Sequence, residues 1–269
     1  MNPMFANLFT AGFLMALPMF ATQIIAHRGA SHDAPENTLS AIRLGYEQNA
    51  DACELDVHLT KDGKIVVIHD ADTKHTSGVS KKIVAQTFDD LHRQNVGNWG
   101  KWKGRGLSEK IPTLGEVLTL IPDDRRLFIE IKCGQEILPE LGQVLQRSGK
   151  APEQTVIIGF DYQTMKAAKS KFANLEVNWL VASPGRINKM ARLKQVIEKA
   201  VAAKLDGLDL NCRFPIDRES VARVHGAGLK LYTWTVDNPK IALREAEAGV
   251  DGITTNRPAW LREQLAAKS

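Results

Sequence analysis

Short apolar runs alternate with amphipathic stretches along most of the chain. Nine runs rich in aliphatic and β-branched residues have the length and composition of buried strands. They are residues 23–27, 53–59, 65–69, 127–132, 156–160, 177–181, 207–211, 230–236 and 252–255. Stretches with helical spacing of apolar positions lie between most of them, at residues 38–48, 135–147, 162–171, 193–204, 218–225 and 239–248. This alternation predicts a parallel sheet covered by helices.

The second and third runs are too close together for a parallel connection. Only residues 60–64 separate them, whereas a parallel crossover needs about a dozen residues or more. The Asp62-Gly63 pair is typical of a tight hairpin turn. We therefore expect residues 65–69 to fold back antiparallel on residues 53–59, which leaves eight parallel strands. The sequence predicts an α/β fold, a (β/α)8 TIM barrel.

Two segments do not fit the alternation. Residues 72–110 are rich in turn residues and longer than an ordinary connection, so we expect a small inserted subdomain near the barrel mouth. The pattern resumes just before Thr113, which is positioned to cap a helix. Residues 5–21 are apolar and uncharged, shorter than a membrane span of about 20 residues, and typical of a signal-peptide core.

We expect residues 1–21 to be a signal peptide and residues 22–269 to form one barrel domain. The protein would then be periplasmic or secreted, with no stable membrane insertion of the mature chain. No Lys or Arg precedes the apolar stretch, and a start at Met15 or Met19 would instead leave a cytoplasmic protein.

The composition narrows the function only slightly. The 269 residues are 43% hydrophobic and 25% charged, with a formal net charge of +4, and no block of Lys and Arg indicates a nucleic-acid partner. The three cysteines, Cys53, Cys133 and Cys212, lie in apolar or strand-like runs without metal-ligand spacing, so we interpret them as buried apolar residues. A mildly basic chain suits a small anionic substrate.

Ionisable residues gather at the ends of predicted strands, where the catalytic residues of such barrels lie. Residues i and i+2 of a strand share a face, so Glu54 and Asp56 point the same way, as do Glu130 and Lys132. Alternatively, two of them, such as Glu54 and Lys132, would form an ion pair that only stabilises the fold. Burying so many charges is costly without a metal or an anionic ligand. Three carboxylates without a thiolate favour Mg²⁺ or Ca²⁺.

Two histidines and two cations complete this predicted site. His27 ends the first strand and His69 ends the hairpin, and imidazoles can serve as general acid and base near neutral pH. Arg28 and Lys132 are positioned to neutralise the charge of a phosphate. Two weaker candidates are His32, as a substrate contact, and His58, which we expect beyond the metal.

Nine motifs follow one another in a fixed order. They are HRGAS at 27–31, PENT at 35–38, ELDV at 54–57, TKDG at 60–63, VIHD at 67–70, IPTL at 111–114, IEIK at 129–132, WTVDN at 234–238 and DGITTN at 251–256. With this ordered set the chain resembles the glycerophosphodiester phosphodiesterase family. The resemblance also assigns residues 72–110 to the family's small insertion. One departure is Lys74-His75-Thr76, where the family usually has an Arg-Thr pair; a lysine lacks the planar fork of an arginine.

The resemblance implies three groups of site residues: a catalytic acid/base pair, the ligands of one divalent cation, and the contacts to phosphate and substrate. They are His27 and His69; Glu54, Asp56 and Glu130; and Arg28, Lys132 and Trp234. For Asn37 in the PENT motif we expect a structural role in the loop and the cap of the first helix.

The implied reaction is metal-dependent hydrolysis of a glycerophosphodiester to sn-glycerol 3-phosphate and an alcohol. An alternative is a lysophospholipase D or phospholipase C-like enzyme on the same barrel, which needs an apolar surface to which Trp99, Trp102 and Leu107 would contribute. A non-catalytic binding protein is disfavoured because no site residue is missing. The sequence leaves open Mg²⁺ or Ca²⁺, the leaving alcohol, the identity of the base, attack by water or by a substrate hydroxyl, and the oligomeric state.

Overall fold

The computed structural model describes residues 22–182, 185 and 188–267. The expected signal peptide at residues 1–21 lies outside the described residues, so the localisation stays a prediction. Within those residues, no helix has both the length and the apolar character needed to cross a membrane.

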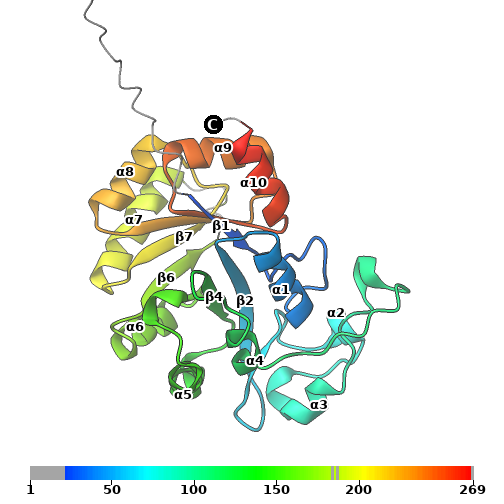
Figure 1. Ribbon diagram of the computed structural model, residues 1–269. Helices are drawn as coiled ribbons and strands as arrows, with labels where there is room; N and C mark the ends of the chain where they lie inside the picture. Colours follow the sequence, from blue (N-terminus) through cyan, green and yellow to red (C-terminus); the bar gives the residue numbers. More distant parts are fainter. Residues whose placement is uncertain (1–21, 183–184, 186–187, 268–269) are drawn as a thin grey trace, which may run out of the picture.

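Among the described residues, eight parallel strands form a closed barrel with helices outside it (Figure 1). The ring closes where β1 (Gln23–Ala26) pairs with both β2 (Ala52–Leu59) and β9 (Gly252–Thr255). The strands between them are β4 (Arg126–Ile131), β5 (Thr155–Gly159), β6 (Glu176–Val181), β7 (Gly207–Asn211) and β8 (Lys230–Trp234). The predicted TIM barrel is confirmed.

Most of the helices that cover the barrel begin at a residue whose side chain caps them. Thr38 accepts a hydrogen bond from the backbone of Ala41, and Thr113 forms a capping box with Glu116, as the sequence indicates for Thr113. The covering helices are α1 (Leu39–Glu47), α4 (Leu114–Leu118), α5 (Leu138–Ser148), α6 (Tyr162–Lys171), α7 (Lys189–Ala202), α8 (Arg218–Gly226), α9 (Pro239–Ala248) and α10 (Pro258–Ala266).

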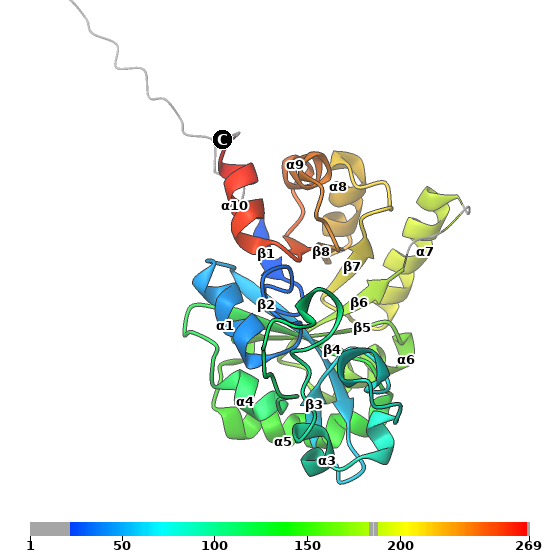
Figure 2. The same ribbon diagram turned by 90° about the vertical axis from the view of Figure 1, so that its right-hand side faces the viewer.

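The extra strand and the insertion form one unit beside the barrel. β3 (Ile65–Val67) pairs antiparallel with β2, which confirms the predicted hairpin. The insertion contains α2 (Lys74–Ser77) and α3 (Phe88–His92) and faces the viewer in Figure 2. It shares a separate apolar core with the hairpin, made of Val66, Ile68, Ile83, Leu91, Val96 and Ile111. The Lys101 ammonium donates to the His32 carbonyl, so the insertion contacts the loop that follows β1.

Strand alternation divides the barrel residues into two layers. On β7, Leu208 and Leu210 are fully buried in the core between strands and helices, so Asp209 points into the barrel. The apolar interior consists of Ile25, Ala52, Phe128, Val156, Ile158, Leu180 and Tyr232. This packed interior supports a polar site at the carboxyl ends of the strands.

Candidate active site

A cavity of about 300 Å³ opens among the strand ends. It brings together all members of the three implied groups of site residues except Asp56. The lining residues are His27, Arg28, Glu54, His69, Glu130, Lys132, Ile158, Phe160, Leu180, Asp209, Trp234, Thr235 and Thr254. The cavity therefore has a charged half, from β1 to β4, and a largely apolar half, from β5 to β8.

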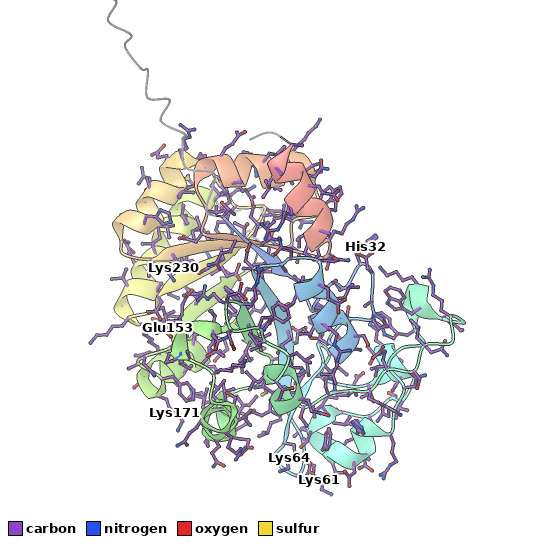
Figure 3. All side chains as sticks on the ribbon, in the orientation of Figure 1. His32, Lys61, Lys64, Glu153, Lys171 and Lys230 are labelled. Atoms are coloured by element: carbon purple, nitrogen blue, oxygen red, sulfur yellow. The ribbon has the colours of Figure 1, made fainter. Side chains whose placement is uncertain are left out.

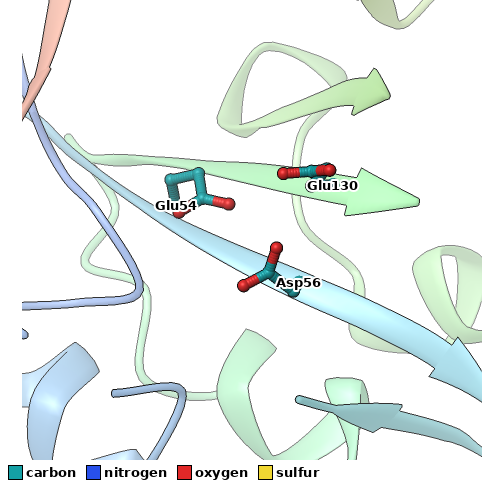
Figure 4. Close-up of side chains that lie close together, drawn as sticks. All are labelled: Glu54, Asp56 and Glu130. Carbon is teal, nitrogen blue, oxygen red and sulfur yellow. The ribbon is translucent and has the colours of Figure 1, made fainter. Parts of the chain in front are cut away.

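Three buried carboxylates meet at this cavity. One oxygen each from Glu54, Asp56 and Glu130 lies within 4.8 Å of the others, on the adjacent strands β2 and β4 (Figure 4). Glu54 Oε1 and Asp56 Oδ1 are buried and have no hydrogen-bond partner among the described residues. Unpaired buried carboxylate oxygens are costly, and a hard divalent cation satisfies them. The donor set fits such an ion.

The pKa values of these carboxyls reflect their crowding. Burial and then the charge of Asp56 raise the pKa of Glu54 well above its ordinary value and that of Glu130 to about 7. Burial alone would also raise the pKa of Asp56, but Arg28 and Lys132 lower it. Glu54 and Glu130 thus resist ionisation, because their negative charges would repel one another and that of Asp56. A cation bound among the three carboxylates would relieve this repulsion.

Arg28 connects the first strand to this cluster. Its backbone N–H donates to Glu54 Oε2 at 2.9 Å. Its guanidinium donates to Glu36 Oε1 at 2.8 Å and lies 3.3 Å from Asp56 Oδ2. Lys132 approaches from β4, with its ammonium 2.8 Å from Glu130 and 3.5 Å from Asp56. Burial alone would lower the pKa of Lys132, but the neighbouring carboxylates raise it by more, and the same holds for Arg28. Both side chains therefore stay charged.

The turn after β1 requires a glycine. Gly29 has a positive φ of 76°, and a Cβ there would lie 2.4 Å from the backbone of Ala41 in α1. This close approach of the loop to α1 holds His27 and Arg28 over the cavity.

His27 is oriented by a chain of polar groups from the loops after β8 and β9. Its Nδ1 lies 2.7 Å from Asn256 Oδ1, and the amide nitrogen of Asn256 donates to Asp237. Because an amide oxygen only accepts, His27 carries its proton on Nδ1 and leaves Nε2 with a lone pair. Nε2 lies 4.0 Å from Glu54 Oε2. Burial and the neighbouring Arg28 lower the pKa of His27 to about 4.

His69 has a different partner. Its Nδ1 lies 2.7 Å from Asp70 Oδ1, so its orienting partner is a carboxylate on the next residue. The other oxygen of Asp70 lies 3.6 Å from Nδ1 of His75 in the insertion. His58 is buried on β2, and its Nε2 lies 3.1 Å from the backbone carbonyl oxygen of His69. It therefore supports the segment that carries His69.

Two weaker expectations are corrected. Asn37 does not cap α1: Thr38 does, and the Asn37 amide pairs with Asp56 instead. His32 lies outside the cavity in the loop after β1, with its ring hydrogen-bonded to Asp33 and its side chain 49% exposed (Figure 3).

The sequence did not reveal the orienting roles of Asn256 and Asp237, although these residues lie in the DGITTN and WTVDN motifs. It also did not reveal Phe160 and Asp209 as cavity residues, because strand patterns alone do not say which alternate residue faces inward.

A TIM barrel with buried carboxylates, two cations and two histidines at its strand ends has the site of a hydrolase acting on a phosphorylated substrate. The model of the Glycerophosphoryl diester phosphodiesterase family matches residues 27–260. The chain belongs to this family of phosphoric diester hydrolases.

Individual relatives agree with this assignment. The chain is 34% identical to a glycerophosphodiester phosphodiesterase of Caldanaerobacter subterraneus, over 89% of this chain and 96% of the relative. It is 30% identical to one of Bacillus subtilis, over 87% and 83%.

Solved structures show the same fold. A phosphodiesterase of Oleispira antarctica, in complex with the product sn-glycerol-3-phosphate, has a TM-score of 0.77 and 27% identity, with 91% of this chain and 96% of that chain covered. A glycerophosphodiester phosphodiesterase of Thermotoga maritima has a TM-score of 0.72 and 26% identity, with 90% and 97% covered.

Proposed function

We propose that the protein hydrolyses glycerophosphodiesters to sn-glycerol 3-phosphate and an alcohol, with one Mg²⁺ or Ca²⁺ held by Glu54, Asp56 and Glu130. The observation that carries the proposal is the cluster of three buried carboxylates, with oxygens of Glu54 and Asp56 that have no hydrogen bond, beside the cavity that both histidines line. The product held by the Oleispira antarctica phosphodiesterase supports the choice of substrate.

Arg28 and Lys132 bind the phosphate in this proposal. Both are cations that line the cavity beside the carboxylates. The bound divalent ion would supply Lewis-acid polarisation of the phosphate and offset its charge. The side chains of Arg28 and Lys132 then neutralise the remaining negative charge and hold the phosphorus atom between the two histidines.

We assign His27 as the general base and His69 as the general acid. Asn256 fixes the proton of His27 on Nδ1, so Nε2 can accept a proton from the attacking hydroxyl. Asp70 accepts a hydrogen bond from His69 Nδ1 and orients the ring, so that His69 can deliver a proton to the leaving alkoxide. The same base serves whether the nucleophile is water or a glycerol hydroxyl beside the phosphate.

The apolar half of the cavity is suited to the organic part of the substrate. Trp234 and Phe160 meet edge to face, with ring centroids 5.3 Å apart. A lysophospholipid would need an apolar surface outside the cavity. Trp102 is buried and does not contribute to one, whereas Trp99, whose ring packs against His75 at 4.4 Å, and Leu107 are half-buried.

Product analysis tests the proposed reaction. Purified protein with Mg²⁺ or Ca²⁺ is incubated with glycerophosphocholine in ¹⁸O-labelled water, and the products are followed by phosphorus NMR and mass spectrometry. We expect sn-glycerol 3-phosphate that carries the label, together with unlabelled choline. Phosphocholine and glycerol, or no turnover, would contradict the proposal.

A further inference from the structure

Asp209 is a buried acid to which the proposed chemistry gives no task. It lies at the centre of β7 and pairs in register with Leu180 on β6 and Tyr232 on β8, both part of the apolar barrel interior. Its side chain points into the barrel and lines the cavity, yet the residue is only 1% exposed. It is not one of the three clustered carboxylates.

The surroundings of Asp209 do not explain its presence as a structural residue. Its Oδ1 has no hydrogen-bond partner among the described residues. Burial, and then the charge of Glu130, raises the pKa of Asp209 well above its ordinary value. An unpaired buried carboxyl costs stability, so its position in a cavity points to a ligand that pairs with it.

The position of Asp209 is fixed by the apolar half of the cavity. The indole N–H of Trp234 donates to the Asp209 backbone carbonyl at 3.1 Å. Ile158, Leu180 and Phe160 line the same half, and none of them can hydrogen-bond through its side chain. Apart from the hydroxyls of Thr235 and Thr254, which also line the cavity, the Asp209 carboxyl is the side-chain group that a polar part of the substrate meets here.

We propose that Asp209 hydrogen-bonds a hydroxyl group of the substrate and thereby selects polyol phosphodiesters over those without that hydroxyl. This proposal rests on the proposed function of the site. A hydroxyl fits better than a substrate ammonium, because the Lys132 ammonium already lies 5.7 Å from the centroid of the Phe160 ring on this wall. The hydroxyl belongs either to the glycerol group or to the leaving alcohol.

Pairs of compounds that differ only in hydroxyl groups test the proposal on the metal-loaded enzyme. For the glycerol group, the inhibition constants of sn-glycerol 3-phosphate and propyl phosphate are compared. For the leaving alcohol, kcat/KM is compared for glycerophosphoglycerol and glycerophosphopropanol. Each pair gives a ratio that measures how strongly the enzyme prefers the hydroxyl-bearing compound.

We expect Asp209→Ala to lower one of these two ratios roughly 10-fold or more, because the hydrogen bond to the hydroxyl is lost. The ratio that falls identifies the source of the hydroxyl. Asp209→Asn, which keeps a hydrogen-bonding amide, is expected to retain most of the preference. Glu245→Gln is the matched control: Glu245 is a fully buried acid on α9 outside the cavity, and its substitution should change neither ratio.

Thermal melting separates this role from a structural one. Removal of an unpaired buried acid is expected to leave the Tm of Asp209→Ala equal to or above that of the wild type. Unchanged ratios in Asp209→Ala would overturn the proposal, and so would a lower Tm with an equal loss of both members of each pair. If the wild type itself fails to release glycerol 3-phosphate from glycerophosphocholine, the proposed function fails instead.

Discussion

Asn37 and Asp56 exchange two hydrogen bonds at the floor of the site. The Asn37 amide nitrogen donates to Asp56 Oδ2 at 2.8 Å, and the Asp56 backbone N–H donates to Asn37 Oδ1 at 3.2 Å. Asn37 has a positive φ of 58°, which asparagine tolerates better than most residues. One carboxylate oxygen of Asp56, Oδ2, is therefore held by Asn37. The other, Oδ1, lies 3.5 Å from the Lys132 ammonium without a hydrogen bond, and we propose that it binds the cation.

Asn37→Ala is expected to weaken binding of Mg²⁺ or Ca²⁺ roughly 10- to 100-fold, because Asp56 loses the amide that orients it. Calorimetric titration of the metal-free protein measures this affinity. Asn174→Ala, at an exposed position on the opposite end of the barrel, is the matched control. Equal metal affinity in Asn37→Ala and wild type would show that the amide does not orient a metal ligand.

The leaving group distinguishes the roles of the two histidines. His69→Ala should lose far more activity on glycerophosphocholine than on a 4-nitrophenyl glycerophosphodiester, because nitrophenolate leaves without protonation. His27→Ala should lose activity on both substrates. We expect losses of roughly 100-fold or more where the histidine is needed.

His32→Ala serves as the control, since His32 lies outside the cavity and should leave both activities unchanged. The reverse pattern, with His27→Ala rescued by the better leaving group, would exchange the assigned roles. Full activity in both cavity variants would refute the catalytic assignment.

The pH profile should show a low acid limb. A base acts only while unprotonated, and burial and Arg28 lower the pKa of His27 to about 4. At saturating metal, kcat/KM should therefore hold steady as the pH falls through 6.5 and decline only near pH 4. Initial rates between pH 4 and 8 measure the profile. An acid limb near the ordinary histidine value of about 6.5 would contradict this account of His27.

Glu176 stabilises the opposite end of the barrel. It accepts hydrogen bonds from Arg126 and from Lys230, which begins β8 (Figure 3), at 2.6 Å each. Burial would raise the pKa of Glu176, but these two cations lower it to about 2. A carboxyl with a lowered pKa stabilises the fold above its unfolded value of about 4.5, and this contribution is lost as the pH falls towards 2.

Glu176→Gln should therefore lower the free energy of unfolding at pH 7 by roughly 3 kcal/mol. The difference from wild type should shrink as the pH falls from 5 to 3, because the carboxyl of the unfolded wild-type chain then becomes protonated while that of the folded protein stays ionised. Urea unfolding at several pH values measures both effects, with the exposed Glu247→Gln as control. A difference that stays constant with pH would show that the charge of Glu176 does not contribute.

The fold was predictable because local patterns determine it. Barrel strands are buried on both faces and appear as continuous apolar runs, and the Asp62-Gly63 turn marks the antiparallel pairing of β2 with β3. Element ends moved by one to several residues: β1, for example, ends at Ala26, so His27 stands just beyond it in the loop.

The site was predictable in part, because motifs name residues but not their partners. Glu54 and Asp56 share a face by strand spacing alone, and their meeting with Glu130 follows from the pairing of β2 with β4. Asn37 was assigned to the wrong partner, since a cap and a carboxylate contact use the same amide chemistry. Asp209 was overlooked because only the closed barrel shows that it faces the cavity.

The most direct test of the proposed function is glycerol 3-phosphate release from glycerophosphocholine by residues 22–269, assayed after EDTA treatment and again after Mg²⁺ or Ca²⁺ is restored. We expect EDTA to abolish release, one of the two ions to restore it, and Glu130→Gln to require far more of that ion. Release that persists in EDTA would contradict a reaction that depends on a cation held by Glu54, Asp56 and Glu130.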